Sequence, residues 1–594
     1  IEKYYADKGR TTVLQHAHSP HGEKVFEING HRFSVDLYDP DEDIVWEILG
    51  DFFHGCQSCF APDAALVGGE EARSLYARTM ERLRLIQTKV KTVKFIWECD
   101  IKKALANKEK NASMIDFFRI TEIISRLVPR DALIGGRVEV MRSVLRRSLT
   151  TIIRYLDVVS MYPACLALRE YPLGQPKVFM ETADFKFDAV TGVTLGGYRG
   201  LIKCTVLAPR NLLVPVLAYR ADKSLFFTNC KGCADGRIPK CPHATEAGRS
   251  WTGTFTTIEV ERALQEGYRV LKIHEIWHWE RWCDQVYKGF FKKFMKMKYA
   301  ASPFPAGVTR YEDKLAYCAK VSKKLDFNLT PEEVEESASL RTVAKLCNNS
   351  GWGKNAEKPV QTKTSFVTFA DYIKLCKDGS EEITGFEIQS DTHIMVSHRP
   401  VAASVRANRY SAVHHAAFCT SYARIMLYDI IKQLSGSIAY CDTDSVIFDH
   451  PRGANPLEHL LTNELGELSD EIPDGWEIDE VIFAGCKNYT MRLVNLETGE
   501  KSFKNANRGF CKDAATLEKL NHDVIREMVV EHEPASIEIV RPNLKRKFGL
   551  IVTKDERKIY RPVSKKRAIR GEGVFEIHVP YGYVPDIDEE EDEE

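Results

Sequence analysis

Apolar residues on both sides of a short acidic tip predict a hairpin at residues 437–449, SIAYCDTDSVIFD. Two runs of strand-forming residues are separated by turn-forming ones, a pattern typical of strand, turn and strand. Asp442 and Asp444 flank a single Thr at the tip, so their carboxylates have little freedom. Hard oxygen ligands of this kind suit Mg²⁺. The pattern fits either a plain hairpin or a metal site, and a metal site would need a further carboxylate elsewhere.

A second apolar run, TIIRYLDVVSMYPACLALREYPLG at 151–174, predicts a strand that leads to Asp157. The SMYP segment then ends the strand, and a helical pattern follows. A lone Asp at the end of a strand is most often structural. Asp157 becomes a candidate for the missing carboxylate only because the chain also holds Asp442 and Asp444.

A helical pattern with a start signal covers residues 330–359. Thr330 as cap and Pro331 in the first turn predict that the helix begins there. Lys345, Asn349 and Gly353 follow at i, i+4 and i+8 and therefore share one helical face. Lysine can meet a phosphate as a mobile point charge, and glycine lets a flat group approach the backbone.

A cysteine-rich stretch, NCKGCADGRIPKCPH, lies at 229–243 and is followed by a strand, helix, strand pattern at 248–280. Cys230, Cys233, Cys241 and His243 are four ligands that suit tetrahedral Zn²⁺. Only one residue separates the last two ligands, which is closer than usual. Unpaired structural cysteines remain the alternative.

The first 125 residues have a different pattern, with predicted strands that carry Asp36 and Glu47. A helix and a further strand, which ends at Glu98, complete the block. Cys56 and Cys59 are candidate metal ligands together with His54, but the sequence offers no evident fourth ligand.

Composition narrows the picture. The chain has 594 residues and a net charge of −1, so nucleic-acid binding would depend on local basic clusters such as 292–298 and 543–549. Such clusters are more often solvated faces, and only in a nucleic-acid enzyme do the two interpretations become about equal. No apolar run reaches the roughly 18 residues of a membrane helix, and no signal peptide opens the chain. The 16 scattered cysteines indicate reduced thiols or metal ligands inside a cell. Because the sequence starts at Ile1, we expect a missing upstream part.

Three of these segments resemble the motifs of family B DNA polymerases. DVVSMYP is similar to motif A, KLCNNSGWGK to motif B and YCDTDS to motif C, and their order and spacing also match. LIGGR at 133–137 resembles the Gly-Gly motif that contacts the template, with Leu133 in place of an aromatic residue. CKNYTM at 486–491 resembles the Lys-x-Tyr motif that holds the primer end.

The resemblance implies a role for each matched residue. Asp157 and Asp444 would bridge two Mg²⁺ ions, with Mn²⁺ as an alternative, and Asp442 would be a weaker ligand or a supporting acid. The nucleotide-binding residues would be Tyr162 beneath the sugar, Lys345 at the triphosphate, Asn349 and Gly353 at the nascent pair, and Trp352 where the family usually has Tyr. The DNA-binding residues would be Gly135, Gly136, Arg137, Lys487 and Tyr489.

The gaps between the three motifs are long, and they lie at the places where protein-primed polymerases carry two insertions. In this respect the chain resembles that branch. The cysteine-rich stretch resembles a segment of polymerases from Polinton/Maverick elements and their viral relatives. The expected partners are primer-template DNA, deoxynucleotides and a terminal protein, with no membrane. The expected location is the nucleus or a viral replication site, with the mitochondrion not excluded.

The first block resembles very-short-patch-repair endonucleases, at Asp36 and His54, although Asp51 replaces a Cys of their pattern. We therefore expect an α+β multidomain chain: a right-hand polymerase with two protein-primed-type insertions after a restriction-endonuclease-like α/β block. The expected boundaries are 1–125 for that block, 126–200 and 401–500 for the palm, 201–310 and 357–400 for the insertions, 311–356 for the fingers, 501–586 for the thumb and 587–594 for an acidic tail. Two alternatives stay open: an inactive DNA-binding relic, and an endonuclease that acts through Asp36 and His54. We find no exonuclease carboxylate motifs in 1–130. Either they precede Ile1 in the complete protein or the chain does not proofread, and the start at Ile1 favours the former.

Overall fold

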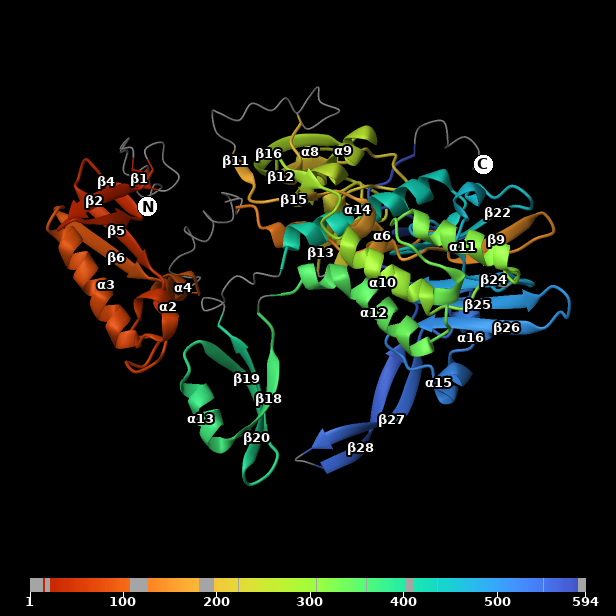
Figure 1. Cartoon of the computed structure of the whole chain (residues 1–594). Coiled ribbons are helices and arrows are strands. Elements are labelled where there is room, and N and C mark those ends of the chain that lie inside the picture. Colours follow the sequence, from red (N-terminus) through yellow and green to blue (C-terminus); the bar gives the residue numbers. More distant parts are fainter. Residues whose placement is uncertain are drawn as a thin grey trace. The chain divides into compact units, whose positions relative to one another are not determined.

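The computed structural model describes residues 14–16, 22–106, 126–180, 197–222, 224–305, 307–358, 360–401, 411–434, 436–547 and 550–585 (Figure 1). The acidic tail, 587–594, lies outside the described residues. Backbone contacts divide the chain into two units: 1–124, 358–409 and 543–554 form one, and 125–357, 410–542 and 555–594 form the other. Helices and sheets are segregated in several parts, so the predicted α+β multidomain organisation is confirmed.

A nine-stranded sheet, here called the central sheet, is the core of the larger unit. Its strands run in the order β26-β25-β24-β9-β22-β21-β7, with β23 beside β9 and β8 beside β24. The bounds are β7 Val138–Val140, β8 Val144–Arg146, β9 Thr151–Val158, β21 Ile438–Asp442, β22 Ser445–Pro451, β23 Leu468–Asp470, β24 Trp476–Gly485, β25 Asn488–Asn495 and β26 Lys501–Asn507.

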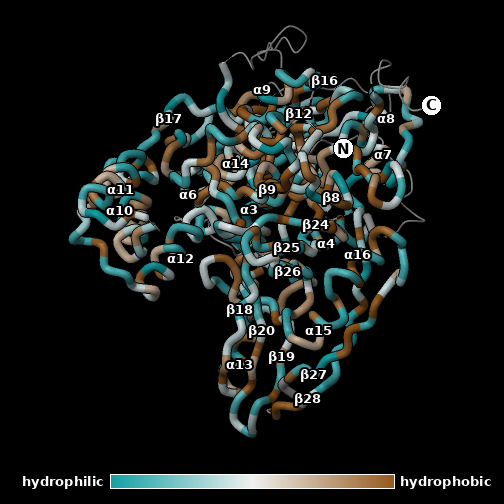
Figure 2. Tube along the Cα trace, turned by 90° about the vertical axis from the view of Figure 1, so that its right-hand side faces the viewer, coloured by the Kyte–Doolittle hydropathy of each residue, from teal (hydrophilic) through white to brown (hydrophobic). Residues whose placement is uncertain are grey.

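Both faces of the central sheet are covered by apolar clusters, because successive side chains along a strand point to opposite faces. Leu156 and Val158 of β9 pack in one apolar cluster with helices α6 (Met161–Leu168) and α14 (Val413–Gln433). Ile153 faces the other way, into a second cluster with β24 and β25. Figure 2 shows hydrophobic segments gathered around β9 and β24. The strand that ends at Asp157 is therefore fixed by packing on both of its faces.

The segment predicted as the first insertion, together with β11 before it, forms a four-stranded antiparallel sheet in the order β11-β16-β12-β15. The bounds are β11 Lys177–Met180, β12 Gly200–Leu207, β15 Trp251–Thr256, α9 Thr257–Gln265 and β16 Arg269–His278. The strand, helix, strand prediction for 248–280 is thus confirmed. A hairpin of β13 (Ala218–Ala221) and β14 (Ser224–Phe227) leads into the short helices α7 (Lys231–Gly236) and α8 (Glu246–Arg249); two short strands, β10 (Tyr171–Pro172) and β17 (Trp282–Cys283), pair with each other.

Three helices form the region with motif B: α10 (Lys288–Ala300), α11 (Tyr311–Lys323) and α12 (Ala338–Asn355). The predicted helix start at Thr330 is wrong. Thr330 does form a capping box with Glu333, but this box caps the short 3₁₀ turn Pro331–Glu333. The long helix begins after Ser337, whose hydroxyl accepts from the Leu340 amide. Since α10 packs on α12, the helical region also begins before residue 311.

The C-terminal part of the larger unit contains α15 (Ala514–Lys519), α16 (His522–Val530) and the pair β29 (Ala568–Arg570) and β30 (Ile577–Val579). A long two-stranded ribbon, β27 (Ile537–Lys547) with β28 (Leu550–Tyr560), precedes that pair. Its far end carries the exposed side chains of Leu544, Leu550 and Ile551.

Two further parts are described separately. In the N-terminal block the sheet order is β1-β4-β5-β6, where β5 and β6 are parallel, beside the hairpin β2–β3. The bounds are β1 Gln15–His16, β2 Lys24–Ile28, β3 His31–Val35, β4 Leu37–Asp39, β5 Ile44–Leu49, α2 Asp51–His54, α3 Ala72–Gln87, β6 Thr92–Trp97 and α4 Glu98–Ala106. The segment predicted as the second insertion is a sheet of order β18-β20-β19 with one helix: β18 Lys363–Thr368, α13 Phe369–Lys377, β19 Glu381–Ile388 and β20 His393–Pro400. Among the helices of the described ranges, none is long and apolar enough to cross a membrane.

Candidate active site and metal clusters

The acidic tip of the predicted hairpin lies beside the end of β9. Strands β21 and β22 pair as predicted, with Asp442 opposite Ser445. Ser445 in turn lies opposite Asp157 on β9, and the Val158 amide donates to the carbonyl of Asp444 at 2.7 Å. The three carboxylates that the sequence placed almost 300 residues apart are therefore neighbours on adjacent strands.

The electrostatics of this cluster show mutual repulsion. Burial, then the charges of Asp444 and Glu471, raise the pKa of Asp157 to about 7. Burial and Asp442 raise the pKa of Asp444 to about 6. Like charges held close together resist ionisation, and a divalent cation between them would relieve that cost. The donor set thus fits hard cations such as Mg²⁺.

The Gly-Gly segment packs directly on the acidic turn. Thr443, between the two Asp residues, has a φ of +64°, and its amide donates to the Arg137 carbonyl at 2.7 Å. A Cβ on Gly136 would lie 2.7 Å from Thr443 Cγ2, whereas a Cβ on Gly135 would meet nothing within 4 Å. Gly136 is therefore needed for close approach inside the site.

Arg137 requires a correction. Its side chain is 1% exposed, pairs with Glu139 and donates to the Pro215 carbonyl. Arg567 also pairs with Glu139, and both partners are buried. A guanidinium enclosed in this way has no surface to offer DNA, so the predicted DNA contact of Arg137 is wrong and its role is in packing.

The Lys-x-Tyr residues border the carboxylates. Lys487 has a φ of +60°, and its Nζ lies 2.5 Å from Asp442 Oδ1. Its amide donates to the hydroxyl of Tyr440, which itself donates to Asp442. The hydroxyl of Tyr489 lies 3.5 Å from that of Tyr155. Their proposed contacts with the primer stay a prediction.

Motif B lies next to motif A in the structure. The rings of Tyr162 and Trp352 lie 5.0 Å apart, centroid to centroid, and tilted by 32°. Lys345 is exposed and lowers the pKa of Asp157 through its charge. Asn349 is exposed on the same helix, and the α-carbon of Gly353 faces open space. The nucleotide-binding roles assigned to these residues stay predictions.

The sequence reasoning missed three residues of this region. Glu471 follows β23 and acts electrostatically on both Asp157 and Asp444, and Lys504 lies 3.8 Å from it. Lys298 of α10 donates to the Ser160 hydroxyl at 3.4 Å, and its pKa is lowered by burial and then by Arg341 and Lys345. Only the lysine spacing at 292–298 gave a signal for Lys298.

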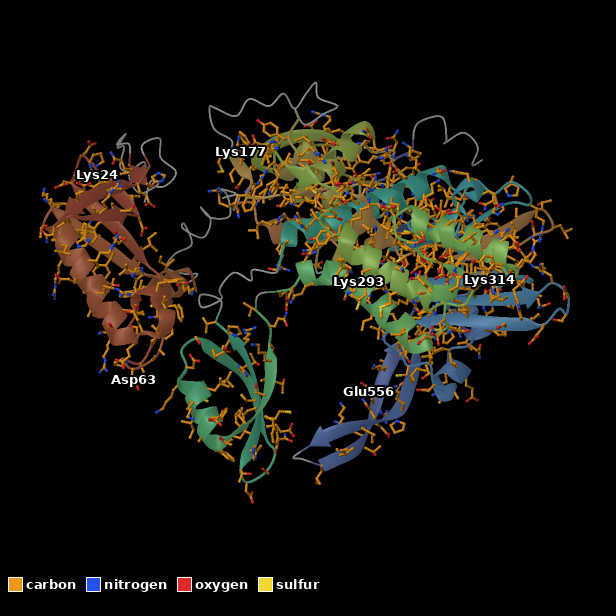
Figure 3. The ribbon with its side chains drawn as sticks, in the orientation of Figure 1. Lys24, Asp63, Lys177, Lys293, Lys314 and Glu556 are labelled. Atoms are coloured by element: carbon orange, nitrogen blue, oxygen red, sulfur yellow. The ribbon has the colours of Figure 1, made fainter. Side chains whose placement is uncertain are left out.

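The basic cluster 292–298 divides in the structure. Lys292 pairs with Asp326 and Lys296 with Glu333, while Lys298 faces the start of α6. Figure 3 labels Lys293, which projects from α10 and is exposed. Part of the second cluster, 543–549, lies outside the described residues.

The predicted zinc ligands come together. One ligand atom from each of Cys230, Cys233, Cys241 and His243 lies within 4.8 Å of all the others. His243 Nδ1 is 3.4 Å from the sulfur atoms of both Cys230 and Cys233. Burial raises the Cys241 pKa, but hydrogen bonds, first from the His243 backbone, outweigh it and lower the pKa to about 7. The chemistry and the spacing of these donors fit Zn²⁺. We call residues 228–243 the knuckle.

A second group of the same kind lies in the N-terminal block, and it corrects the expected ligands there. Cys56 and Cys59 lie with Asp51 and Cys99, again within 4.8 Å of one another. His54, which the sequence suggested, is not in this group; its Nδ1 lies 3.0 Å from the Thr79 hydroxyl. His54, at the end of helix α2, therefore lies outside the group, whereas Cys99, at the start of α4, is part of it.

The predicted endonuclease residues are also close enough to interact. Burial, then Arg82, lowers the pKa of His54, and Asp36 opposes this through its charge. Asp36 follows β3 and accepts from the Ile48 amide at 2.7 Å. Buried Glu47 pairs with Arg82 at 3.0 Å.

Comparison with known proteins agrees with the motifs. Residues 103–307 match the family described as DNA polymerase type B, organellar and viral. A DNA polymerase from Kluyveromyces lactis is 21% identical over 392 residues, which cover 64% of this chain and 32% of the relative. The chain thus spans about a third of the length of that relative.

Solved structures of Phi29 DNA polymerase are also similar. One with primer-template DNA and incoming nucleotides aligns with 84% of this chain and 74% of its own, at 14% identity and a TM-score of 0.46. Another, with primer-template DNA alone, aligns with 83% and 74% at 15% identity and a TM-score of 0.44. The match at 103–307 and the curated relative thus both point to DNA polymerases, and the matched family model is that of organellar and viral type B enzymes.

Proposed function

We propose that this chain is a DNA-templated DNA polymerase that extends a primer by two-metal nucleotidyl transfer. One observation carries the proposal: Asp157, Asp442 and Asp444 converge from two distant segments, and their electrostatics favour bound cations. The intact cluster argues against an inactive DNA-binding relic.

The proposed reaction is an in-line displacement. The primer 3′-hydroxyl loses its proton to solvent water and attacks the α-phosphorus; a new O–P bond forms as the bond to the pyrophosphate leaving group breaks. Asp157 and Asp444 would hold the two divalent ions, which supply charge stabilisation for the attacking and leaving oxygens. The packed strands hold these two carboxylates still.

Other side chains would position the substrates. Lys345, Lys298 and Arg341 gather positive charge on one side of the carboxylates, where a triphosphate would lie. The Tyr162–Trp352 pair offers a ring platform for the sugar and the nascent base pair. Lys487, beside Asp442, would meet the primer end.

The proposal includes protein priming and a Polinton-like origin. Two added sheets support it: the one that carries the knuckle and the one formed by β18, β19 and β20. A terminal protein would then supply the first hydroxyl. Incubation with a candidate terminal protein and labelled deoxynucleotide should label that protein covalently; extension of DNA primers with no labelling would confine the activity to ordinary priming.

Primer extension tests the main proposal. Asp444→Asn removes a proposed metal ligand and little surface, so it should abolish extension in Mg²⁺ while fluorescence anisotropy shows nearly unchanged DNA binding. Asp474→Asn is the matched control, because Asp474 is an exposed acid outside the cluster. Extension by Asp444→Asn within about tenfold of the parent would refute the assignment.

We also propose that the two cysteine groups bind Zn²⁺. Elemental analysis should find about two Zn²⁺ per chain. Cys230→Ser with Cys233→Ser should remove one ion, and Cys59→Ser with Cys99→Ser the other. Exposed Cys376 provides the control, since Cys376→Ser should remove none. A folded, active sample without zinc would contradict this proposal.

A nuclease activity of the N-terminal block is the second candidate. The lowered pKa of His54, with Asp36 near enough to act on it through its charge, supports this candidate, because a neutral imidazole can accept a proton. Nicking of supercoiled DNA should be lost in Asp36→Asn and kept in Asp444→Asn. Nicking that survives Asp36→Asn would exclude these residues.

A further inference from the structure

The last described segment of the chain, residues 561–585, lies against the knuckle, and we call it the strap. Its aromatic residues Tyr581 and Tyr583 share one apolar cluster with Cys230 and Cys233 of the knuckle. The other buried members are Phe226 and Ala234 at the knuckle and Ala568 and Val579 of the strap. Each segment therefore supplies much of the core that buries the other.

The contact extends to the backbone next to the first two ligands. The Asn229 amide donates to the Tyr581 carbonyl at 2.9 Å, and the Thr228 hydroxyl donates to the same carbonyl at 2.8 Å. Gly582 has a φ of +85°, and a Cβ there would lie 2.3 Å from Cys230 Cβ. No side chain larger than hydrogen fits between the strap and this ligand.

The second pair of ligands is linked to the strap through Arg210. The Val584 amide donates to the Arg210 carbonyl at 2.9 Å. The guanidinium of Arg210 donates to the His243 carbonyl at 2.8 Å and lies 3.8 Å from Cys241 Sγ. Both halves of the ligand set are therefore linked to the same stretch of the strap, the first by direct contact and the second through Arg210.

The other end of the strap is joined to the central sheet. Lys566 donates to the Val138 carbonyl at 3.0 Å, and Arg567 pairs with Glu139 in the interior. The His578 amide donates to the Met141 carbonyl at 2.8 Å. Val138 and Glu139 belong to β7, which pairs with β21 so that Val138 lies opposite Asp442.

We infer that metal binding in the knuckle and docking of the strap are coupled, so that the loaded knuckle holds the strap on the strand next to Asp442. The inference rests on the proposed zinc site and is independent of the polymerase activity. A site of four ligands on a short segment gains its order from the ion, because binding free energy becomes folding free energy. By linkage, whatever the ion adds to strap docking, the docked strap adds to ion affinity.

Two measurements on the full chain test the coupling from its two sides. In the first, hydrogen exchange is followed in peptides of the strap and of β24–β25. Cys241→Ser should speed exchange at least about fivefold in the strap and leave β24–β25 unchanged. Cys318→Ser, a buried cysteine of another cluster, is the matched control.

In the second, zinc affinity is measured by competition with a chromophoric chelator. The knuckle ion is identified as the one lost in Cys230→Ser. Gly582→Ala should weaken this ion at least about fivefold, because the added methyl separates strap and ligand. Gly453→Ala is matched in backbone strain, with a φ of +78° but nothing near the added Cβ, and should leave affinity unchanged.

The outcomes separate the hypotheses. Faster strap exchange together with weaker zinc binding in Gly582→Ala supports the coupling. Parental zinc affinity in Gly582→Ala, or unchanged strap exchange in Cys241→Ser, overturns it even if the zinc site is real. A parent chain whose knuckle holds no zinc overturns both the metal site and the coupling, whatever primer extension shows.

Discussion

Gly136→Ala adds one methyl group at the point where the Gly-Gly segment meets the acidic turn. The new Cβ would lie 2.7 Å from Thr443 Cγ2, 2.8 Å from Oγ1 and 3.0 Å from Cβ. Thr443 cannot easily move away. Its β-branched side chain is stiff, and its amide donates a hydrogen bond to the Arg137 carbonyl. The turn is held further by the Asp444 amide, which donates to the Asp442 carbonyl at 2.6 Å.

The strain should therefore be relieved by a shift of the turn that carries both carboxylates. Overpacking of this kind costs about 1–3 kcal/mol. If that cost falls on the placement of Asp442 and Asp444, the rate of chemistry falls about five- to 150-fold. Stability should fall by no more than the same free energy, and DNA affinity should change little.

Single-turnover extension at saturating primer-template and nucleotide measures this rate, and thermal unfolding measures stability. Gly135→Ala is the matched control, because the neighbouring glycine has nothing within 4 Å of an added Cβ. The double variant Gly136→Ala with Thr443→Gly should recover most of the rate, since glycine removes the clash and suits a φ of +64°.

Two results would refute this reasoning. Equal rates for Gly135→Ala and Gly136→Ala would show that the contact with Thr443 does not place the carboxylates. A slow Gly136→Ala that Thr443→Gly fails to rescue would point to a loss at the template instead.

Four other predictions concern the same region. Tyr162→Val should relax discrimination against ribonucleotides at least about tenfold in single-turnover incorporation, because a smaller side chain leaves room for a 2′-oxygen, and an unchanged ratio would exclude Tyr162 as the gate. With the Asp157 pKa near 7, the Mg²⁺ concentration for half-maximal extension should rise about tenfold from pH 8 to pH 6, because protons compete with the ion; a flat requirement would contradict this. In Mg²⁺-free buffer the folded state binds the Asp157 proton more tightly than the unfolded state does, so the free energy of unfolding should rise as pH falls through 7 towards 4. Thermal unfolding should show that Asp157→Asn reduces this trend. Glu139→Gln leaves the buried guanidiniums of Arg137 and Arg567 without their counter-charge and should cost about 3–5 kcal/mol in denaturant unfolding; wild-type stability would mean that solvent reaches them.

The sequence alone determined which segments carry the chemistry. A hairpin with Asp442 and Asp444 at its tip and a strand that ends at Asp157 follow from local alternation and turn residues, and the structure has both. The four knuckle ligands lie within 15 residues of one another, so the short chain between them already keeps them close in space. Local pattern and short spacing are properties that a linear sequence holds completely.

Tertiary structure decided what lies next to these segments. Strand pairing and packing bring Glu471 and Lys504 close to the carboxylates, and their spacing in the sequence does not predict this proximity. Cys99 joins Cys56 across 43 residues, while His54, only two residues away, turns elsewhere because helix α2 sets its direction. Arg137 looked like a DNA contact beside two glycines, yet burial with Glu139 gives it a packing role. Burial and the pairing of distant charges depend on the whole fold, and for that reason these residues could not be assigned from their neighbours in sequence.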